Sequence, residues 1–288
     1  MEEMRFKGQV QGLEMDRVMR DQEFSMAVRH FHDTYELYYL LEGERYYFID
    51  QETYLVKAGD VVLIRPNQIH KTSAAGNPRH ERILLQIEAG VVEPFLKVCR
   101  AGTMEELFHL SAAVIKTGEE EGRQIRNLME QLERELSVRQ EFQSGMAGLL
   151  VAQLVLLLLR CQQKTSWYQE PETVRTWKHQ KVHEVARYLM KYPETRESLS
   201  QLAARFYVSK SYLSRIFKEV TSFTVNEYKN ISRIKKSQEL LTGSRYSVTE
   251  IAEILGYETV TYYERVFKRY TGMTPLRYRK KGEGAAGA

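Results

Sequence analysis

The chain has little cysteine and no long uninterrupted apolar run. Its two cysteines, Cys99 and Cys161, are far apart in the 288 residues, and neither belongs to a CxxC pair. This argues against a disulfide framework and a structural zinc site, and it fits a reducing compartment. The apolar stretch 149–159 is broken by Gln153 and is shorter than the about 20 residues needed to cross a bilayer. Residues 1–12 are charged and lack an apolar centre, so we expect no secretory leader and a cytoplasmic protein without a membrane partner.

The chain also lacks a strong net charge, but its charge is unevenly distributed. The formal net charge is +4. Residues 179–281 hold 20 Lys and Arg against 10 Asp and Glu, whereas the remainder holds 22 against 28. Basic domains usually bind nucleic acid or another polyanion, so the last third of the chain is the candidate for such a partner. A length of 288 residues suits two domains or one large one.

Short runs rich in β-branched and aromatic residues characterise the N-terminal half. Turn sequences such as Glu42-Gly43 and Pro66-Asn67 separate them. This spacing predicts an antiparallel β-sandwich or barrel. The expected strands are residues 35–41, 45–50, 53–57, 61–65 and 82–88.

The same region contains a histidine pattern that resembles a cupin. The residues that match the first cupin motif, HxHx3Ex6G, are His30, His32, Glu36 and Gly43. Those that resemble the second motif, with altered spacing, are Gly59, Pro66 and His70. The resemblance implies that the predicted strands form a cupin jelly-roll.

Two uses of these side chains remain open. His30, His32, Glu36 and His70 would supply three imidazoles and one carboxylate, a set able to hold a divalent first-row metal. His30 and His32 are two positions apart on a strand, so their side chains point to the same side. The alternative is a polar pocket that hydrogen-bonds a ligand without a metal, with Tyr38 as a further lining residue. We expect no cofactor, because the second motif is altered and sensor cupins often lack a metal.

Residues 119–163 carry a helical pattern. The apolar residues at three- and four-residue steps include Ile125, Leu128, Met129, Leu132 and Leu136. The following segment, 148–159, is apolar almost all round and must be buried on several sides. Two arrangements are open for this segment: it is buried against the β-domain alone, or against a second subunit as well. We expect a homodimer. The polar stretch 164–178, which contains Pro171, is the expected linker.

The basic third of the chain contains an internal repeat. Residues 198–228 align with residues 247–278 at an offset of 49 before the central turn and 50 after it. The matched pairs are Leu202 with Ile251, Ala203 with Ala252, Arg215 with Arg265, Phe217 with Phe267 and Lys218 with Lys268. Capping boxes, formed by Ser198 with Gln201 and by Ser247 with Glu250, predict where each first helix begins.

Each copy has the layout of a helix-turn-helix. The second helix of each copy has an apolar face, formed by Leu213, Ile216, Phe217 and Val220 in one and by Tyr263, Val266, Phe267 and Tyr270 in the other. In this motif the second helix enters the DNA major groove. A charged helical segment, 225–242, connects the copies. It would hold the two reading helices at a fixed separation, and adjacent major grooves on one DNA face are about 34 Å apart.

The last hundred residues resemble the AraC/XylS family of bacterial transcription regulators. The stretch RVFKRYTGMTPLRYR at 265–279 fits the family signature, and a cupin in front is the usual sensor of ligand-responsive members. The first copy departs from the pattern at Ser222, where the second has Gly272, and at Val225, where the second has Pro275. We therefore expect the second helix of the first copy to end less sharply.

The resemblance assigns the base-facing positions of both copies. They are Lys210, Ser211, Ser214 and Arg215 in the first copy, and Val260, Thr261, Glu264 and Arg265 in the second. Arg215 and Arg265 suit guanine or phosphate, Val260 suits a thymine methyl group, and Glu264 could accept from cytosine. Other cations would add salt-sensitive affinity for the DNA backbone: Lys218, Lys229, Lys235, Lys236, Lys268 and Arg269.

Together these patterns predict an α+β chain with a cupin-like sensor (1–118), a helical dimerisation segment (119–163), a linker (164–178), an all-α DNA-binding domain with two helix-turn-helix units (179–281) and a disordered tail (282–288). We expect a transcription regulator, an activator rather than a repressor, that binds double-stranded DNA and a small molecule. A sugar is the favoured effector, and RNA polymerase is the further partner of an activator. The alternative is a cupin metalloenzyme, an isomerase or dioxygenase, that uses His30, His32, Glu36 and His70.

Overall fold

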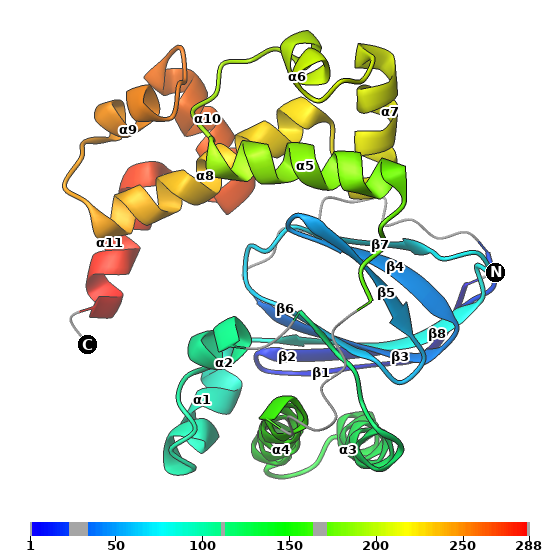
Figure 1. The fold of residues 1–288 in the computed structure, drawn as a ribbon. Helices are drawn as coiled ribbons and strands as arrows, with labels where there is room; N and C mark the ends of the chain where they lie inside the picture. The colour runs from blue at the N-terminus through cyan, green and yellow to red at the C-terminus, as the bar shows by residue number, and fades with distance from the viewer. Residues whose placement is uncertain (1, 23–33, 111–112, 164–171, 287–288) are drawn as a thin grey trace. The chain divides into compact units, whose positions relative to one another are not determined.

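The chain folds into two units. The computed structural model describes residues 2–22, 34–110, 113–163 and 172–286. The N-terminal unit, Met1–Val174, is built on β-sheets, whereas the C-terminal unit, Arg175–Ala288, is helical (Figure 1). The predicted α+β class is therefore confirmed.

The N-terminal unit contains two antiparallel sheets. The larger has the strand order β1 (Glu2–Val10), β2 (Leu13–Arg20), β8 (His80–Ile87), β3 (Tyr35–Glu42), β6 (Val61–Ile64) and β9 (Val114–Ile115). The smaller has the order β5 (Glu52–Lys57), β4 (Glu44–Ile49) and β7 (His70–Ala74). All five expected strands are present. Strands β1, β2, β7 and β9 were not expected. Strand β1 is largely exposed and rich in charged residues, so its sequence carries little of the apolar signal of a strand.

The two faces of the larger sheet serve different purposes. Because side chains alternate along a strand, Leu37 and Tyr39 of β3 join the core under the helices, whereas Tyr38 and Leu40 face the smaller sheet. Glu36 has the same parity as Tyr38 and is 1% exposed. The space between the sheets therefore receives polar as well as apolar side chains.

Four helices cover the outer face of the larger sheet (Figure 1). They are α1 (Ala89–Val98), α2 (Met104–Leu110), α3 (Glu119–Ser137) and α4 (Gln143–Gln163). The apolar face predicted for α3 is buried, from Ile125 to Leu136. Within α4, the segment Gln143–Cys161 is long and apolar enough to cross a membrane. The apolar run 149–159 noted in the sequence is too short to do so. This helix packs against α1 and α3, and its residues Val151, Leu154 and Leu158 lie in the core.

The C-terminal unit consists of seven helices in its described part. They are α5 (Trp177–Lys191), α6 (Leu199–Arg205), α7 (Lys210–Thr221), α8 (Val225–Gly243), α9 (Val248–Ile254), α10 (Val260–Thr271) and α11 (Pro275–Ala286). The pairs α6–α7 and α9–α10 are the repeated units, and α8 is the helix between them. On α8, Ile231, Ile234 and Leu241 are buried.

The ends of the helical unit differ in detail from the expected boundaries. Within the expected linker, Val174 donates a backbone hydrogen bond to Thr53 at 2.7 Å, and Thr173 pairs with Tyr54 of β5. Helix α5 begins at Trp177, inside the range expected for the linker. Helix α11 continues to Ala286, where we expected a tail without structure from residue 282.

Candidate functional site

The first helix of each repeat starts at the capping box read from the sequence. Ser198 and Gln201 form the reciprocal hydrogen bonds at the start of α6, and Ser247 and Glu250 do the same for α9. The starts of α7 and α10 are capped as well. Ser209 accepts from the backbone N–H of Tyr212, and Thr259 accepts from that of Tyr262. These side-chain acceptors satisfy N–H groups that have no partner within the helix.

The turns between the paired helices have the same backbone conformation, but the residue that adopts it is exposed in the first copy and crowded in the second. Tyr207 has φ 57° in the first copy, and Gly256 has φ 69° in the second. Tyr207 is 91% exposed. A Cβ atom on Gly256 would lie 2.7 Å from the carbonyl oxygen of Glu194, so only the second turn requires glycine for space as well as for its φ angle.

The C-terminal ends of α7 and α10 have nearly the same geometry. Ser222 has φ 65° and Gly272 has φ 75°. Each donates its backbone N–H to the carbonyl four residues earlier, Lys218 or Lys268, at 2.9 Å. The expectation that α7 ends less sharply was therefore wrong, because Ser222 adopts the left-handed conformation usually taken by glycine.

Both α7 and α10 bury one face and expose the other. The predicted apolar residues are buried, except that Tyr270 is half-buried. The exposed residues among the predicted base-facing set are Lys210, Ser211, Ser214, Arg215, Thr261 and Arg265. Val260 and Glu264 are half-buried. The structure thus brings each set of four onto one helix surface and leaves it open to a partner.

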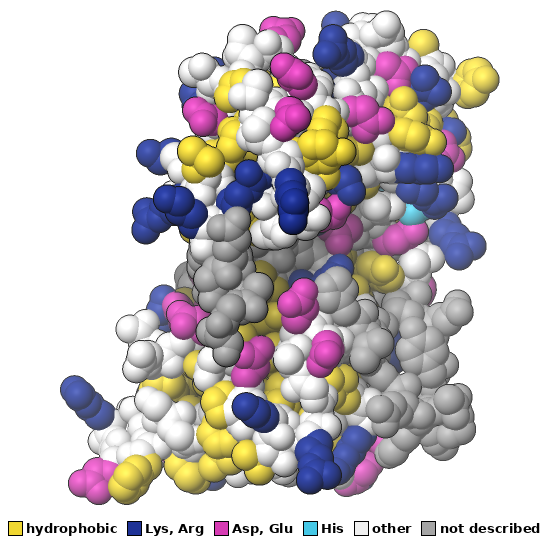
Figure 2. All heavy atoms as spheres, turned by 90° about the vertical axis from the view of Figure 1, so that its left-hand side faces the viewer, with side chains coloured by type: hydrophobic (Ala, Val, Ile, Leu, Met, Phe, Trp, Pro, Cys, Tyr) yellow, Lys and Arg dark blue, Asp and Glu magenta, His cyan; other side chains and the backbone are white. Residues whose placement is uncertain are grey.

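The cations predicted for the DNA backbone differ in their surroundings. Lys218, Lys268 and Arg269 are exposed. Lys229 is half-buried, donates to the carbonyl oxygen of Glu197 at 3.1 Å, and has a pKa lowered chiefly by burial. Lys229 is therefore engaged by a carbonyl of its own unit and less accessible to a DNA phosphate than the exposed cations are. On the face drawn in Figure 2, the basic side chains of the helical unit, at the top of the view, lie among acidic ones.

The space between the two sheets holds a cluster around Glu36. The Tyr47 hydroxyl donates to Oε1 of Glu36 at 3.0 Å, and Nε2 of His70 lies 3.5 Å from Oε2. Burial opposes protonation of His70, but the Glu36 carboxylate, the Gln68 carbonyl and Asp50 together outweigh it and raise the pKa of His70 above its ordinary value. Tyr38 stacks edge-on against Tyr47, with ring centroids 5.2 Å apart. Three of the predicted pocket residues, Glu36, Tyr38 and His70, are thus brought together.

The space between the sheets also holds polar groups that were not predicted. Arg45 is fully buried, and its Nε donates to Oγ1 of Thr72 at 3.0 Å. His80 is 1% exposed, and burial, with Arg45 and Arg20 nearby, lowers its pKa to about 4. The alternation on β4 could have revealed Arg45, since it shares its parity with the buried residues Tyr47 and Ile49.

The proposed metal set cannot be assembled from the described residues. His30 and His32 lie outside them. Within the described ranges, no group of three or more His, Cys, Asp or Glu side chains is placed to hold a metal ion. Glu36 and His70 are the two predicted ligands that the structure places together.

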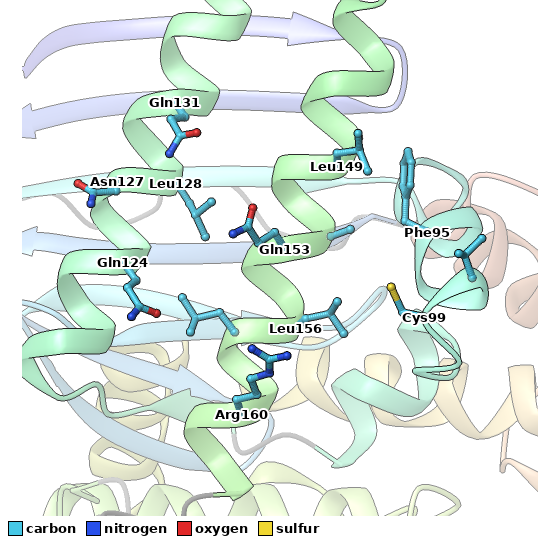
Figure 3. A pocket seen from close by; sticks show the side chains of 13 residues that line it. Phe95, Cys99, Gln124, Asn127, Leu128, Gln131, Leu149, Gln153, Leu156 and Arg160 are labelled. Atoms are coloured by element: carbon cyan, nitrogen blue, oxygen red, sulfur yellow. The ribbon is translucent and has the colours of Figure 1, made fainter.

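A groove lies on the helical side of the N-terminal unit, between α1, α3 and α4 (Figure 3). Its volume is about 700 Å³. Figure 3 shows Gln124, Asn127 and Gln131 along α3 and Gln153 extending from α4 towards α3, whereas Leu149 and Leu156 lie on the side of α4 towards Phe95 and Cys99. The groove is lined by neutral amides and apolar side chains, with Arg160 at one end.

Comparison with known proteins assigns both units. An AraC-like ligand-binding domain matches residues 19–158, and a helix-turn-helix domain matches residues 202–281. The transcriptional activator RhaR of Shigella dysenteriae is 28% identical over 259 residues, which cover 87% of this chain and 86% of RhaR. YisR of Bacillus subtilis, a helix-turn-helix transcriptional regulator, is 23% identical, with 88% of each chain covered. The DNA-binding domain of AdpA, solved with a target DNA, is 27% identical over 36% of this chain and 94% of that one, with a TM-score of 0.35.

Proposed function

Because the chain belongs to the AraC family of DNA-binding transcription regulators, we propose that it is an activator controlled by a small molecule held between its two β-sheets. Its regulator function is shared by relatives that cover most of the chain, and neither family match supports the metalloenzyme alternative. The activator role is supported by the name of RhaR. An activator acts in the cytoplasm and has RNA polymerase as a further partner.

The DNA-reading part of the proposal rests on the repeated geometry of α7 and α10. Each helix begins at a side-chain cap, buries one face in its own unit and exposes the opposite face. In this proposal Arg215 and Arg265 contact guanine edges or phosphates of two neighbouring major grooves, because a guanidinium presents a planar fork of donors.

The contact assignment is tested with the full-length chain and a DNA duplex that the chain itself selects from a random-sequence pool. Arg215→Ala and Arg265→Ala are each expected to weaken binding by about 1–3 kcal/mol, roughly 5- to 150-fold. Lys181→Ala is the control, because Lys181 forms an ion pair with Glu184 on α5, outside both repeats. Unchanged affinity in both arginine variants would refute the assignment.

The effector part of the proposal rests on the buried cluster of Glu36, Tyr38, Tyr47 and His70. Aromatic rings and hydrogen-bonding groups of this kind suit the faces and hydroxyls of a sugar. A ligand that binds one arrangement of the chain better than another shifts the balance between them, which is how binding would alter transcription.

A thermal-shift screen of sugars, with divalent metals as separate additions, tests this assignment. A true effector raises the melting temperature of the wild type, and Glu36→Gln, which keeps the size of the side chain but removes its charge, reduces that rise. A rise that is the same in Glu36→Gln places the ligand elsewhere. A rise caused by a metal alone would instead favour the metal-holding use of the cluster.

The groove between α1, α3 and α4 supports the expected homodimer. Leu149 is 49% exposed and Met146 is 48% exposed, although both belong to the long apolar segment Gln143–Cys161 of α4. Apart from Arg160 at one end, the side chains that line the groove are uncharged, so little like charge opposes a second copy related by a twofold axis. Sedimentation velocity tests this: Leu149→Lys is expected to produce monomer, whereas Gln9→Lys, at an exposed position of β1 outside the groove, should not. A monomeric wild type would contradict the assignment.

A further inference from the structure

The two arginines on the exposed faces of α7 and α10 are stacked in the same way. The guanidinium carbon of Arg215 lies 5.4 Å from the ring centroid of Tyr212, and that of Arg265 lies 5.2 Å from the ring centroid of Tyr262. Both distances fall within the about 6 Å over which a cation is attracted to an aromatic face. The arrangement therefore occurs twice, at equivalent positions of the repeat.

Helix geometry explains why each arginine reaches its tyrosine. Residues three apart are neighbours on a helix surface, and long side chains lean towards the helix N-terminus. Arg215 and Arg265 therefore extend back over the first turn of α7 and α10. In a helix-turn-helix, the N-terminal residues of the second helix contact the base edges. The stacking thus places each guanidinium near the N-terminal end of its helix, which is the end that contacts base edges in this motif.

Each tyrosine ring is itself supported by an aromatic residue from outside its helix. Trp177 of α5 lies 5.4 Å from Tyr212, between ring centroids, at an interplanar angle of 47°. Tyr257, in the turn before α10, lies 6.0 Å from Tyr262 at 60°. Tyr257 is buried and lies beneath Arg233 of α8, at 5.0 Å. Different residues thus provide the same support in the two copies.

We propose that Tyr212 and Tyr262 are positioning residues that hold Arg215 and Arg265 ready to contact DNA. This inference rests on the proposed function of the two arginines. A free arginine side chain loses rotamer freedom when it binds, and a stacked one has lost part of it beforehand. The attraction expected at an exposed site corresponds to about a 2- to 5-fold gain in affinity for each tyrosine. The gain should favour the selected sequence over others, because base contacts need an oriented fork whereas phosphate contacts tolerate several orientations.

The repeat supplies a matched control for a double-mutant cycle. The full-length chain is titrated against its selected duplex and a scrambled duplex at one salt concentration. Tyr262→Leu is expected to lose about 2- to 5-fold in affinity for the selected duplex and less for the scrambled one. The same substitution should cost nothing further in the Arg265→Ala background, but its full factor in the Arg215→Ala background, where the stacked partner is intact. Tyr212→Leu should show the reverse dependence.

Tyr262→Phe separates the ring from its hydroxyl. It keeps the stacking surface and is expected to bind as the wild type does. Thermal unfolding of each variant confirms that the helical unit remains folded, and Tyr262→Phe is the second variant should Tyr262→Leu unfold it. The inference is overturned if Tyr262→Leu loses the same factor in the Arg265→Ala background, or if Tyr262→Phe loses as much as Tyr262→Leu. Unchanged binding by Arg265→Ala would overturn the contact assignment together with the inference, whereas the first two results overturn the inference alone.

Discussion

The ends of α7 and α10 allow a backbone effect on stability to be measured without a change in packing. Ser222 and Gly272 both have positive φ, 65° and 75°. A residue with a Cβ atom pays roughly 1–2 kcal/mol in this conformation, whereas glycine does not. Glycine costs about 0.5–1 kcal/mol more conformational entropy on folding. We therefore expect Ser222→Gly to stabilise the helical unit by about 0.5–1 kcal/mol, and Gly272→Ala to destabilise it by a similar amount.

Gly243 provides the matched control for Gly272. A Cβ atom added at either position meets no atom within 4 Å among the described residues, but Gly243 belongs to helix α8 and lacks a positive φ. Gly243→Ala should therefore be neutral or stabilising, because alanine favours a helix by up to about 1 kcal/mol over glycine. The two Gly→Ala substitutions thus make the same chemical change and place the added methyl group in open space. A loss of stability in Gly272→Ala but not in Gly243→Ala would therefore be due to the φ angle.

The assay is urea unfolding of the full-length chain, followed by the fluorescence of Trp177. Trp177 is the first residue of α5 and stacks against Tyr212 of α7, so it reports on the helical unit. A Trp167→Phe background leaves Trp177 as the only tryptophan of the chain. A shift in midpoint with an unchanged slope measures the change in free energy of unfolding. The reasoning is refuted if Ser222→Gly destabilises, or if Gly272→Ala and Gly243→Ala change stability by the same amount.

Three further outcomes follow from buried contacts. Tyr263→Phe should cost about 1–3 kcal/mol in urea unfolding, because it removes the partner of the buried Ser237 hydroxyl at 2.5 Å; adding Ser237→Ala should recover part of that loss. Gly256→Ala should cost more than Gly272→Ala in the same assay, because its Cβ atom would also press on the Glu194 carbonyl. His80 has a folded pKa of about 4, below its ordinary value near 6.5, so its contribution to stability is present above pH 6.5 and is lost as the pH falls towards 4. Unfolding midpoints of the β-unit from pH 7 to 4 should therefore fall less steeply in His80→Asn than in the wild type.

The sequence predicted the helical unit well because several local signals agreed there. The capping boxes at Ser198 and Ser247 define where two helices start. Because the apolar positions recur in both copies of the repeat, the helix boundaries predicted from one copy could be compared with those from the other. What it could not predict is the conformation of single residues. Ser222 adopts a left-handed φ between Thr221 and Phe223, which are both buried, and serine as a residue type does not indicate this conformation.

The β-unit was predicted less completely for a different reason. Strand β1 pairs with β2 at the edge of the larger sheet, and its mostly exposed side chains give no alternation of buried residues. Arg45 is fully buried between the sheets, although arginine is read from sequence as a surface residue. The cupin resemblance grouped Glu36 with His70. The two side chains lie 3.5 Å apart because β3 of the larger sheet faces β7 of the smaller one, which brings together residues far apart in sequence.

The two reading helices are held in one register by contacts that the duplication alone does not supply. Arg233 of α8 donates to the carbonyl oxygens of Pro193 and Thr195, both at 2.9 Å, in the loop that leads into the first copy. The same guanidinium lies over Tyr257 in the turn of the second copy. In that turn, Gly256 allows the backbone at Glu194 to approach closely. The loop before one reader thus packs on the turn of the other. In the proposed function, a pair of helices held in this way has little freedom left to lose on binding DNA, so the contacts of α7 and α10 add. We expect DNA with a different groove spacing to engage only one of the two helices.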